Sequence, residues 1–245
     1  MYNHERTVGR VTTDLRAFGL DVVLVDDASD AACAAELDRL RASDDRITVH
    51  RHEANRGKGA AVMTGLRAVR EAGFTHALLV DADYQHDLSD IPRFLDAARA
   101  HPEEMICGRP IFGADIPSVR FFGRYICHAF VWLETLSFDI PDSMCGMRLY
   151  PLAPVLSLMQ QERLGSRMDF DTEILVKLNW RGVGMQWLPT KVVYPDDGVS
   201  HFHYFRDNAL LVAMHARLLI GMAVRLPMLV KRNVGRFAKA ARATL

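Results

Sequence analysis

Two aspartates, Asp81 and Asp83, stand one residue apart directly after the short apolar run 76–80. Such a run ending in acids is typical of a buried parallel strand whose carboxyl end opens into a site. Strand residues two apart point to the same side, so the two carboxylates share one face. A divalent cation with phosphate oxygens as further ligands would offset the cost of burying them. Alternatively, one acid caps the next helix and the other is solvated.

The elements before this strand alternate between helix and strand. The patterns predict a helix over 6–18, a strand over 22–25, a helix over 31–41, a strand over 47–50 and a helix from the turn 53–59 to about 72. This alternation indicates a parallel sheet with helices on both faces and a ligand crevice at the carboxyl ends of the strands. No strand precedes the first helix. We therefore expect either that the chain starts one strand too late or that the fold is damaged.

The elements after this strand are less regular. A helix starts at 88–92, with Ser89 or Asp90 as N-cap, and short strands fit 105–107, 185–188 and 191–194. Helices fit 119–138, 154–161 and 171–180. No linker-like run divides the 245 residues, which favours one main domain.

The charges are distributed unevenly. The formal net charge is zero, but the chain from 208 onward has no acid and seven basic residues: Arg217, Arg225, Lys231, Arg232, Arg236, Lys239 and Arg242. Such asymmetry indicates contact with an anionic surface. The four cysteines have no metal-ligand spacing, and no signal peptide opens the chain, so we expect a cytoplasmic protein with reduced thiols.

Six short motifs occur in a fixed order along residues 1 to about 195. They are Tyr2-Asn3-x-Glu5, Val25-Asp26-Asp27-x-Ser29, Asn55-x-Gly57-Lys58-Gly59, Asp81-Ala82-Asp83-x-Gln85-His86, Ser143-x-x-Gly146-x-Arg148 and Phe170-x-x-Glu173. No single motif is specific, but together they resemble the family-2 inverting glycosyltransferases, especially the dolichyl- or polyprenyl-phosphate sugar synthase branch.

The resemblance implies a GT-A type nucleotide-sugar fold over residues 1–205, an α/β sandwich that here lacks the usual first strand. It implies Mg²⁺ or Mn²⁺ held by Asp81 and Asp83 against the diphosphate of a nucleotide-diphosphate sugar. The cation would neutralise the departing nucleoside diphosphate. The residues implied on the donor nucleotide are Tyr2, Asn3, Glu5, Asp26, Asp27, Asn55, Lys58, Asp81 and Ala82.

The acceptor is less well defined by the sequence. A hydroxyl acceptor needs a general base, whereas a lipid phosphate is already an anion and needs cations to position it. The resemblance to the polyprenyl-phosphate branch places Arg109, Arg120, Arg124 and Gln85 on the acceptor side. The candidates for catalysis are Arg148 and three acids whose order stays open: Asp142, Asp171 and Glu173.

The segment 206–245 is a separate, basic helical region. Residues 209–230 are largely apolar but are interrupted by His215, Arg217, Arg225 and Pro227, which fits a membrane span poorly. An interfacial helix at the cytoplasmic face of the inner membrane fits better, and packing on the protein's own core is the alternative. His201 and His203 are expected in a loop that shapes the acceptor mouth.

The sequence therefore predicts a metal-dependent, inverting glycosyltransferase that moves a sugar to a polyprenyl phosphate or another lipid at a membrane surface, with no nucleic acid as partner. Two alternatives stay open. One is the same reaction on a soluble hydroxyl acceptor, which requires one of the three acids as a base. The other is a non-catalytic nucleotide-binding or membrane-docking protein, suggested by the missing strand.

Overall fold

The computed structural model describes residues 1–111, 118–192 and 203–243. Its elements are α1 (Glu5–Ala17), β1 (Val22–Asp26), α2 (Ala31–Ser43), β2 (Ile47–Arg51), α3 (Lys58–Glu71), β3 (His76–Leu79), the 3₁₀ turn η1 (Leu88–Asp90), α4 (Ile91–Ala100), β4 (Met105–Ile111), α5 (Ser118–Thr135), β5 (Arg148–Pro151), α6 (Leu152–Gln161), α7 (Phe170–Trp180), β6 (Met185–Lys191) and α8 (Tyr204–Ala243).

The strands form two separate sheets. β1 and β2 make a parallel pair, while the second sheet has the order β3-β5-β4-β6. β5 runs antiparallel to β3 and to β4, and β4 runs parallel to β6. Mixed pairing of this kind is common in large α/β sheets.

The predicted pairing of the strand at 76–80 is wrong. β3 was expected to lie among parallel strands, but it stands at the edge of the second sheet and pairs antiparallel with β5, with Leu78 opposite Leu149. Sequence alternation predicts neighbours close in the chain, whereas β5 arrives about 70 residues later to occupy this position. The expected strand at 185–188 lies within β6, which continues to Lys191, the first residue of the expected strand at 191–194; residues 193 and 194 lie outside the described residues.

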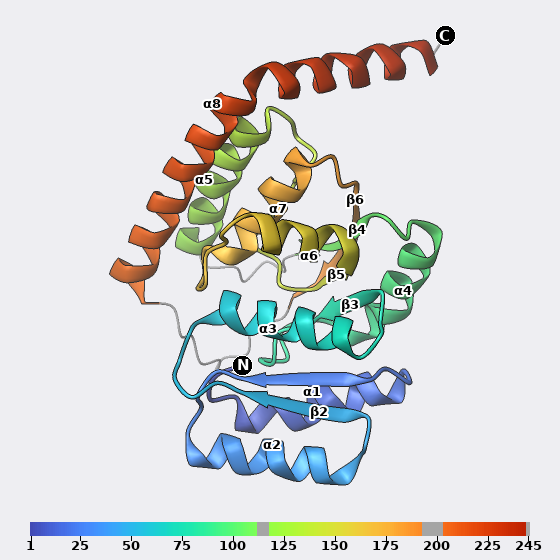
Figure 1. Ribbon diagram of the computed structural model, residues 1–245, viewed down its shortest axis with the longest axis vertical. Helices are drawn as coiled ribbons and strands as arrows, with labels where there is room; N and C mark the ends of the chain where they lie inside the picture. Colours follow the sequence, from blue (N-terminus) through green and yellow to red (C-terminus); the bar gives the residue numbers. More distant parts are fainter. Residues whose placement is uncertain (112–117, 193–202, 244–245) are drawn as a thin grey trace.

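The helices cover both sheets and join them. α2 and α1 lie beside β1 and β2 at one end of the molecule, and α3 contacts both β1 and β3 (Figure 1). α4 packs on β4 and β5, while α6 and α7 pack on each other and on α3. The main core lies where α3, α5 and α7 meet β3 to β5, with Tyr150, Phe170 and Ile174 fully buried. This arrangement puts the carboxyl ends of β1 and β3 at one edge.

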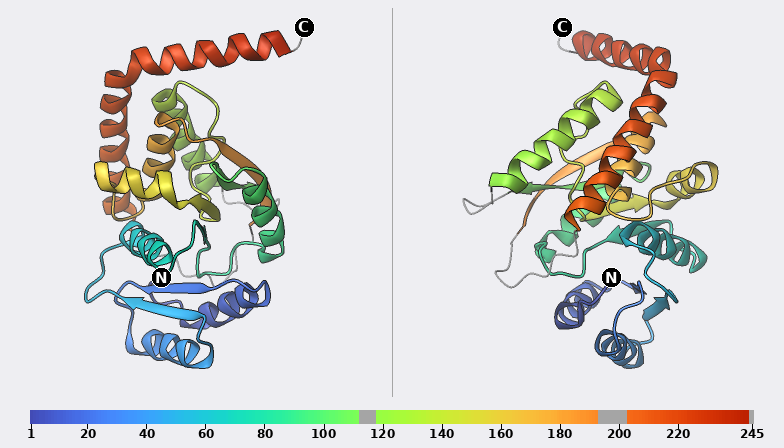
Figure 2. Two further views of the ribbon diagram at one scale, coloured as in Figure 1. Left: turned by 45° about the vertical axis from the view of Figure 1, so that its right-hand side comes forward. Right: turned by 90° about the vertical axis from the view of Figure 1, so that its left-hand side faces the viewer.

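The last helix, α8, packs along α5 and α7 and then bends away from the body of the protein (Figures 1 and 2). Pro227 lies inside it and removes a backbone donor, which accounts for a bend. By length and composition, Tyr204–Gly235 is apolar enough to cross a membrane, although the sequence suggested a poor fit. The core helices of soluble proteins meet the same criteria of length and composition.

Three arginines that interrupt the apolar sequence of α8 make contacts with α7 and the residues beside it. Arg217 Nη2 lies 3.6 Å from Asp169 Oδ2, and the Arg225 guanidinium lies 4.7 Å from the centre of the Trp180 ring. Arg232 Nη2 donates to Asn179 Oδ1 at 2.8 Å. These cations therefore hold α8 to the domain.

Candidate functional site

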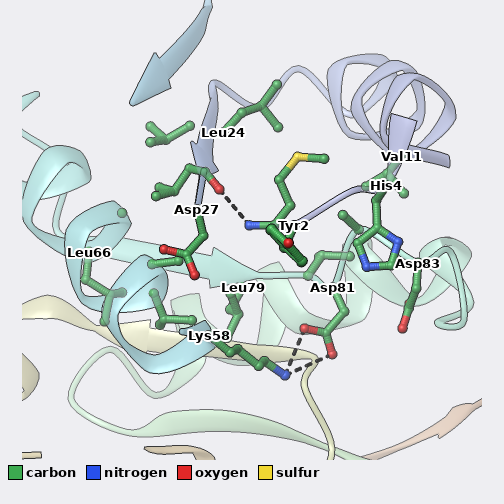
Figure 3. Close-up of a pocket in the computed structure, with 18 of the residues that line it drawn as sticks. Tyr2, His4, Val11, Leu24, Asp27, Lys58, Leu66, Leu79, Asp81 and Asp83 are labelled. Carbon is green, nitrogen blue, oxygen red and sulfur yellow. Dashed lines mark hydrogen bonds and ion pairs between the residues drawn. The ribbon is translucent and has the colours of Figure 1, made fainter. Parts of the chain in front are cut away.

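A cavity of about 1380 Å³ opens at the carboxyl ends of β1 and β3 (Figure 3). The residues that line its polar mouth include the N-terminal residues, the ends of β1 and β3, the start of α3 and the start of α8. Ligands of open α/β sheets bind at such a strand edge. Of the predicted donor and metal residues, those that line it are Tyr2, Asp27, Asn55, Lys58, Asp81, Ala82 and Asp83.

Lys58 lies between two carboxylates. Its Nζ is 2.9 Å from Asp81 Oδ1 and 2.9 Å from Asp171 Oδ2, and Figure 3 shows the contact with Asp81. Burial alone would lower the pKa of Lys58, but the charges of Asp171 and Asp81 raise it well above its ordinary value. Lys58 is thus a permanent cation in the first turn of α3, where the helix N-terminus adds partial positive charge.

Asp81 is held in its ionised form. Burial raises the pKa of Asp81, but the charge of Lys58 and the contact with His86, at 3.8 Å, lower it far more. The carboxylate packs against Gly146, where a Cβ atom would overlap it. This contact explains why the fifth motif has a glycine at position 146, where any side chain would collide with Asp81.

Asp83 differs from Asp81 in that its pKa lies above the ordinary value. Burial and the neighbouring charge of Asp81 raise its pKa, and its Oδ1 accepts a hydrogen bond from the backbone N–H of Gln85 at 3.0 Å. Two crowded carboxylates of this kind fit a divalent cation, which relieves their mutual repulsion. The described residues contain no group of three or more metal-ligating side chains, so donor oxygens and water would complete the shell.

The two aspartates that end β1 have different surroundings. Asp27 accepts hydrogen bonds from the backbone N–H groups of Arg56 and Gly57, at 2.8 and 2.7 Å, and contacts His52 at 2.7 Å. It thereby shapes the loop before α3. Asp26 is fully buried, accepts from Arg51 Nε at 2.8 Å and does not line the cavity.

The N-terminal residues form a loop beside Asp27. The Asn3 side chain accepts from the backbone N–H of Asp30 at 2.9 Å, and Asn3 itself has a φ of +52°, a conformation that asparagine tolerates. The carbonyl of Ala82 accepts from Thr7 Oγ1 at 2.5 Å, which ties α1 to the end of β3. Glu5 begins α1 and is not among the cavity-lining residues.

Arg124, which the sequence predicted on the acceptor side, lies in a cluster with Asp142 and His128. Its Nε and Nη2 donate to the two oxygens of Asp142, at 2.6 and 2.8 Å, and His128 Nε2 lies 3.3 Å from the same carboxylate. Burial raises the pKa of Asp142, but His128 and Arg124 lower it well below its usual range. Arg124 and Gln85 both line the cavity.

Other predicted residues lie away from the cavity. Arg148 is 1% exposed and donates to the backbone carbonyls of Asp171 and Ser143, at 2.6 and 2.8 Å, so it clamps β5 to α7. Glu173 accepts from the Gly165 N–H at 2.6 Å. Arg109 is exposed on β4. The side chain of Arg120 and all of His201 lie outside the described residues.

The cavity includes residues that the motifs did not identify. His4 and Arg167 line it, and Arg167 Nη1 donates to Asn55 Oδ1 at 3.3 Å. Arg167 lies three residues before the Phe170 motif, and a positive charge so close to a motif could have indicated a residue of the site. Arg206 and Asp207 of α8 line it as well, and so does His203 just before α8, which the sequence had already predicted at the mouth of the site. Only the folded chain brings these residues beside the strand ends.

Comparison with known proteins adds independent findings. The family model described as "Glycosyl transferase family 2" matches residues 1–150. A UDP-N-acetylglucosamine–dolichyl-phosphate N-acetylglucosaminyltransferase of Methanococcus voltae is 23% identical over 212 residues, which is 80% of this chain and 84% of that protein. Glycosyltransferase AglD of Haloferax volcanii is 25% identical over 199 residues, covering 77% of this chain and 31% of that protein.

Solved structures are also similar. Glucosyl-3-phosphoglycerate synthase from Mycobacterium tuberculosis in complex with UDP superimposes with a TM-score of 0.66 at 11% identity, covering 89% of this chain and 77% of that one. A complex of that enzyme with Mn²⁺, UDP and glucosyl-3-phosphoglycerate gives 0.60 at 13% identity over 91% and 76%. The likeness confirms the predicted fold class.

Proposed function

This chain belongs to glycosyl transferase family 2, and on that premise we propose that it transfers a sugar, with inversion, from a nucleoside diphosphate to a polyprenyl phosphate. The observation that carries the proposal is the mouth of the cavity. There Lys58, Asp81 and Asp83 meet at the end of β3, and Arg124 lies on the same cavity. Anionic donor and acceptor groups would thus each face a cation.

The donor would bind with its diphosphate at Asp83 and Asp81. A divalent cation held there would supply Lewis-acid neutralisation of the leaving nucleoside diphosphate. Lys58 fixes the position of Asp81, and Asp27 fixes the loop 55–57 on which a nucleotide would rest. The protein's contribution at this side is electrostatic preorganisation.

The acceptor would bind with its phosphate near Arg124. Asp142 and His128 orient this guanidinium, and both Asp142 oxygens accept from it, so we infer that Asp142 positions Arg124 rather than removes a proton. A phosphate acceptor needs no general base, which is consistent with such a site. The printed name of the Methanococcus relative, a dolichyl-phosphate enzyme, favours the same acceptor class.

Membrane attachment would come from α8 and α5. Exposed apolar side chains on α8 include Val212, Ile220 and Val224, at 69, 68 and 76% exposure, while Ile126 on α5 is 62% exposed. Arg217, Arg225 and Arg232 of α8 are held by α7 and its neighbours, so this apolar surface is free to enter an interface. We propose that residues 206–245 attach the enzyme peripherally to the cytoplasmic face of the membrane.

The test uses the full chain with a panel of UDP- and GDP-sugars and polyprenyl phosphate in vesicles. We expect a glycosyl phospholipid of inverted anomeric configuration by NMR, formed with Mg²⁺ or Mn²⁺ and lost with a chelator or in Asp83→Asn. Asp96→Asn, on the exposed face of α4, is the matched control. Transfer to soluble hydroxyl acceptors but not to the lipid phosphate would contradict the proposed acceptor.

A further inference from the structure

Four basic side chains line the cavity among the residues that the structure describes: Lys58, Arg124, Arg167 and Arg206. Three of them have an acidic partner. Lys58 and Arg124 form ion pairs with aspartates, and Arg206 Nε lies 3.3 Å from Asp207 Oδ1. Arg167 is different, because no described Asp or Glu side chain forms an ion pair with its guanidinium, which donates to Asn55. Its charge is therefore available to an anion in the cavity.

The segment 165–169 fixes the position of Arg167. The Gly165 N–H donates to Glu173 Oε2 at 2.6 Å, and the Arg167 N–H donates to Asp169 Oδ1 at 3.1 Å. Arg217 Nη2 of α8 lies 3.6 Å from the Asp169 carboxylate and 3.7 Å from that of Glu173. The backbone that carries Arg167 is thus held in place before any ligand binds, which lowers the entropy cost of binding.

This segment packs against the first turn of α3. The Ala60 N–H donates to the Ser166 carbonyl at 2.9 Å. A Cβ atom at position 57 would lie 2.5 Å from Arg167 Cγ, and one at position 59 would meet the backbone of the segment at 2.7 Å. Gly57 and Gly59 therefore permit the close contact. It places Arg167 beside the turn before α3, on the side of the cavity where the donor is proposed to bind.

The Asn55 side chain joins Arg167 to the end of β1. Its Oδ1 accepts from Arg167 Nη1 at 3.3 Å, and its Nδ2 donates to the carbonyl of Asp27 at 3.3 Å. Asn55 and Asp27 also line the cavity. Because a guanidinium has several N–H donors in one plane, this contact orients the group and leaves donors for a ligand.

The anion that fits this position is a phosphate group. A guanidinium binds phosphate oxygens with two N–H donors at once, and its charge is permanent. Lys58, on the same side of the cavity, is already balanced by Asp81 and Asp171, so it adds no net positive charge. A diphosphate at Asp81 and Asp83 would therefore need a protein cation in addition to the metal ion.

We propose that Arg167 binds a phosphate oxygen of the nucleoside diphosphate donor and that Asn55 and Asp169 hold it in place for this role. The inference rests on the proposed function for the nature of the donor, and it adds a binding residue that none of the six motifs contains. Charge grows on the leaving diphosphate as the sugar bond breaks, so the same ion pair would stabilise the transition state as well.

The test compares Arg167→Met, Arg167→Lys and the control Arg163→Gln in the full chain. Methionine keeps the apolar part of the side chain that lies against Gly57, which protects the fold, and Arg163 is exposed and does not line the cavity. UDP and GDP are titrated by calorimetry with Mn²⁺ present, and Tm is recorded for each variant.

We expect Arg167→Met to lose at least about tenfold in affinity for the diphosphate that the unchanged chain binds. Arg167→Lys should lose less, because it keeps the charge but not the planar fork. Arg163→Gln should bind as the unchanged chain does. Equal diphosphate affinities of Arg167→Met and the unchanged chain overturn the inference, whereas sugar transfer that persists still supports the proposed function.

A second measurement separates the donor from the acceptor. Binding to vesicles that contain polyprenyl phosphate should be the same for Arg167→Met and the unchanged chain. Weaker vesicle binding with unchanged diphosphate affinity overturns the inference, because Arg167 then serves the acceptor. An unchanged chain that binds neither UDP nor GDP overturns the inference and the proposed donor together. Transfer to soluble acceptors alone, with diphosphate binding that depends on Arg167, supports the inference and overturns only the proposed acceptor.

Discussion

The Nζ atom of Lys58 lies 2.9 Å from Oδ1 of Asp81, which ties the first turn of α3 to the second residue after β3. The same amine reaches Asp171 on α7. One side chain therefore connects three elements that are far apart in sequence, and it balances two acids at the mouth of the cavity.

Replacing Lys58 by methionine should both destabilise the fold and abolish donor binding. The change leaves two partly buried carboxylates without their cation, which costs 3–5 kcal/mol for fully buried pairs. Because about a quarter of the Lys58 side chain is exposed, we expect a loss of about 2 kcal/mol in urea unfolding. Lys231→Met, on the exposed face of α8, is the control. Unchanged stability would contradict the bridging role.

Gly146→Ala should displace the Asp81 carboxylate. A Cβ atom at 146 would overlap Oδ2 and Cγ of Asp81, so either Asp81 or the loop must shift. We expect donor affinity, measured by calorimetry with metal present, to fall by roughly tenfold or more. The control is Gly123→Ala, whose Cβ meets no other atom within 4 Å. Equal affinities for the two variants would show that the Gly146 contact does not set the position of Asp81.

Asp142→Asn separates the positioning role of Asp142 from that of a base. Loss of its charge weakens the hold on Arg124, so we expect KM for the lipid phosphate to rise roughly tenfold with kcat changed far less. The measurement is steady-state kinetics across pH. If Asp142 is instead the general base, kcat falls strongly and the acidic limb of the pH profile disappears.

Stability should fall as pH rises because of His215 on α8. Burial lowers its pKa, but hydrogen bonds from its ring to Cys127 and to Glu134, at 2.7 Å for the latter, raise it to about 9. The pKa of His215 is higher in the folded protein than its unfolded value of about 6.5, so protonated His215 stabilises the folded state. This stabilisation is fully present below pH 6.5 and is lost as pH rises through 9. Tm measured from pH 6 to 9.5 should fall, and His215→Gln should flatten that slope. A slope that persists in the variant assigns it to another group.

Charged substitutions on the exposed face of α8 should release the protein from membranes. Ile220→Asp with Val224→Asp removes apolar contact and adds repulsion from anionic headgroups. We expect vesicle flotation to drop at least about tenfold, with Tm little changed because both side chains are exposed. The charge-matched control is Ala35→Asp with Ala42→Asp on α2. If the control loses flotation equally, the added negative charge, and not the loss of apolar contact at α8, releases the protein from the vesicles.

The sequence predicted the fold class and most of the elements, because strand and helix periodicities are local. The helix over 6–18 corresponds to α1, and the strand over 22–25 corresponds to β1. The position of β5 beside β3 was not predictable from alternation, since a late strand inserts between earlier ones. Pairing partners depend on long-range contacts that no local pattern encodes.

The site shows the same division. Motif order predicted that Lys58, Asp81 and Asp83 would gather at one strand edge, and the three residues line one cavity. Their roles on donor and metal stay predictions. Whether a charged motif residue faces a ligand or a protein partner depends on its neighbours. Asp26 forms an ion pair with Arg51, and Arg148 donates its hydrogen bonds to backbone carbonyls. Arg167 was missed because its relevance arises from contact with Asn55, far away in sequence.

The separation of the two sheets has a consequence for cooperativity. The β1–β2 pair has its own apolar cluster with α1 and α2, centred on the fully buried Cys33 and Leu37, distinct from the core around Tyr150. Among the described residues no strand ladder joins the two sheets, so the coupling between this N-terminal layer and the second sheet runs through α3, which contacts both β1 and β3, and through the contact of Lys58 with Asp81. Because its apolar cluster is separate from the main core, we expect the layer to open at a lower free energy than the core around Tyr150, with α3 as the element that links the two.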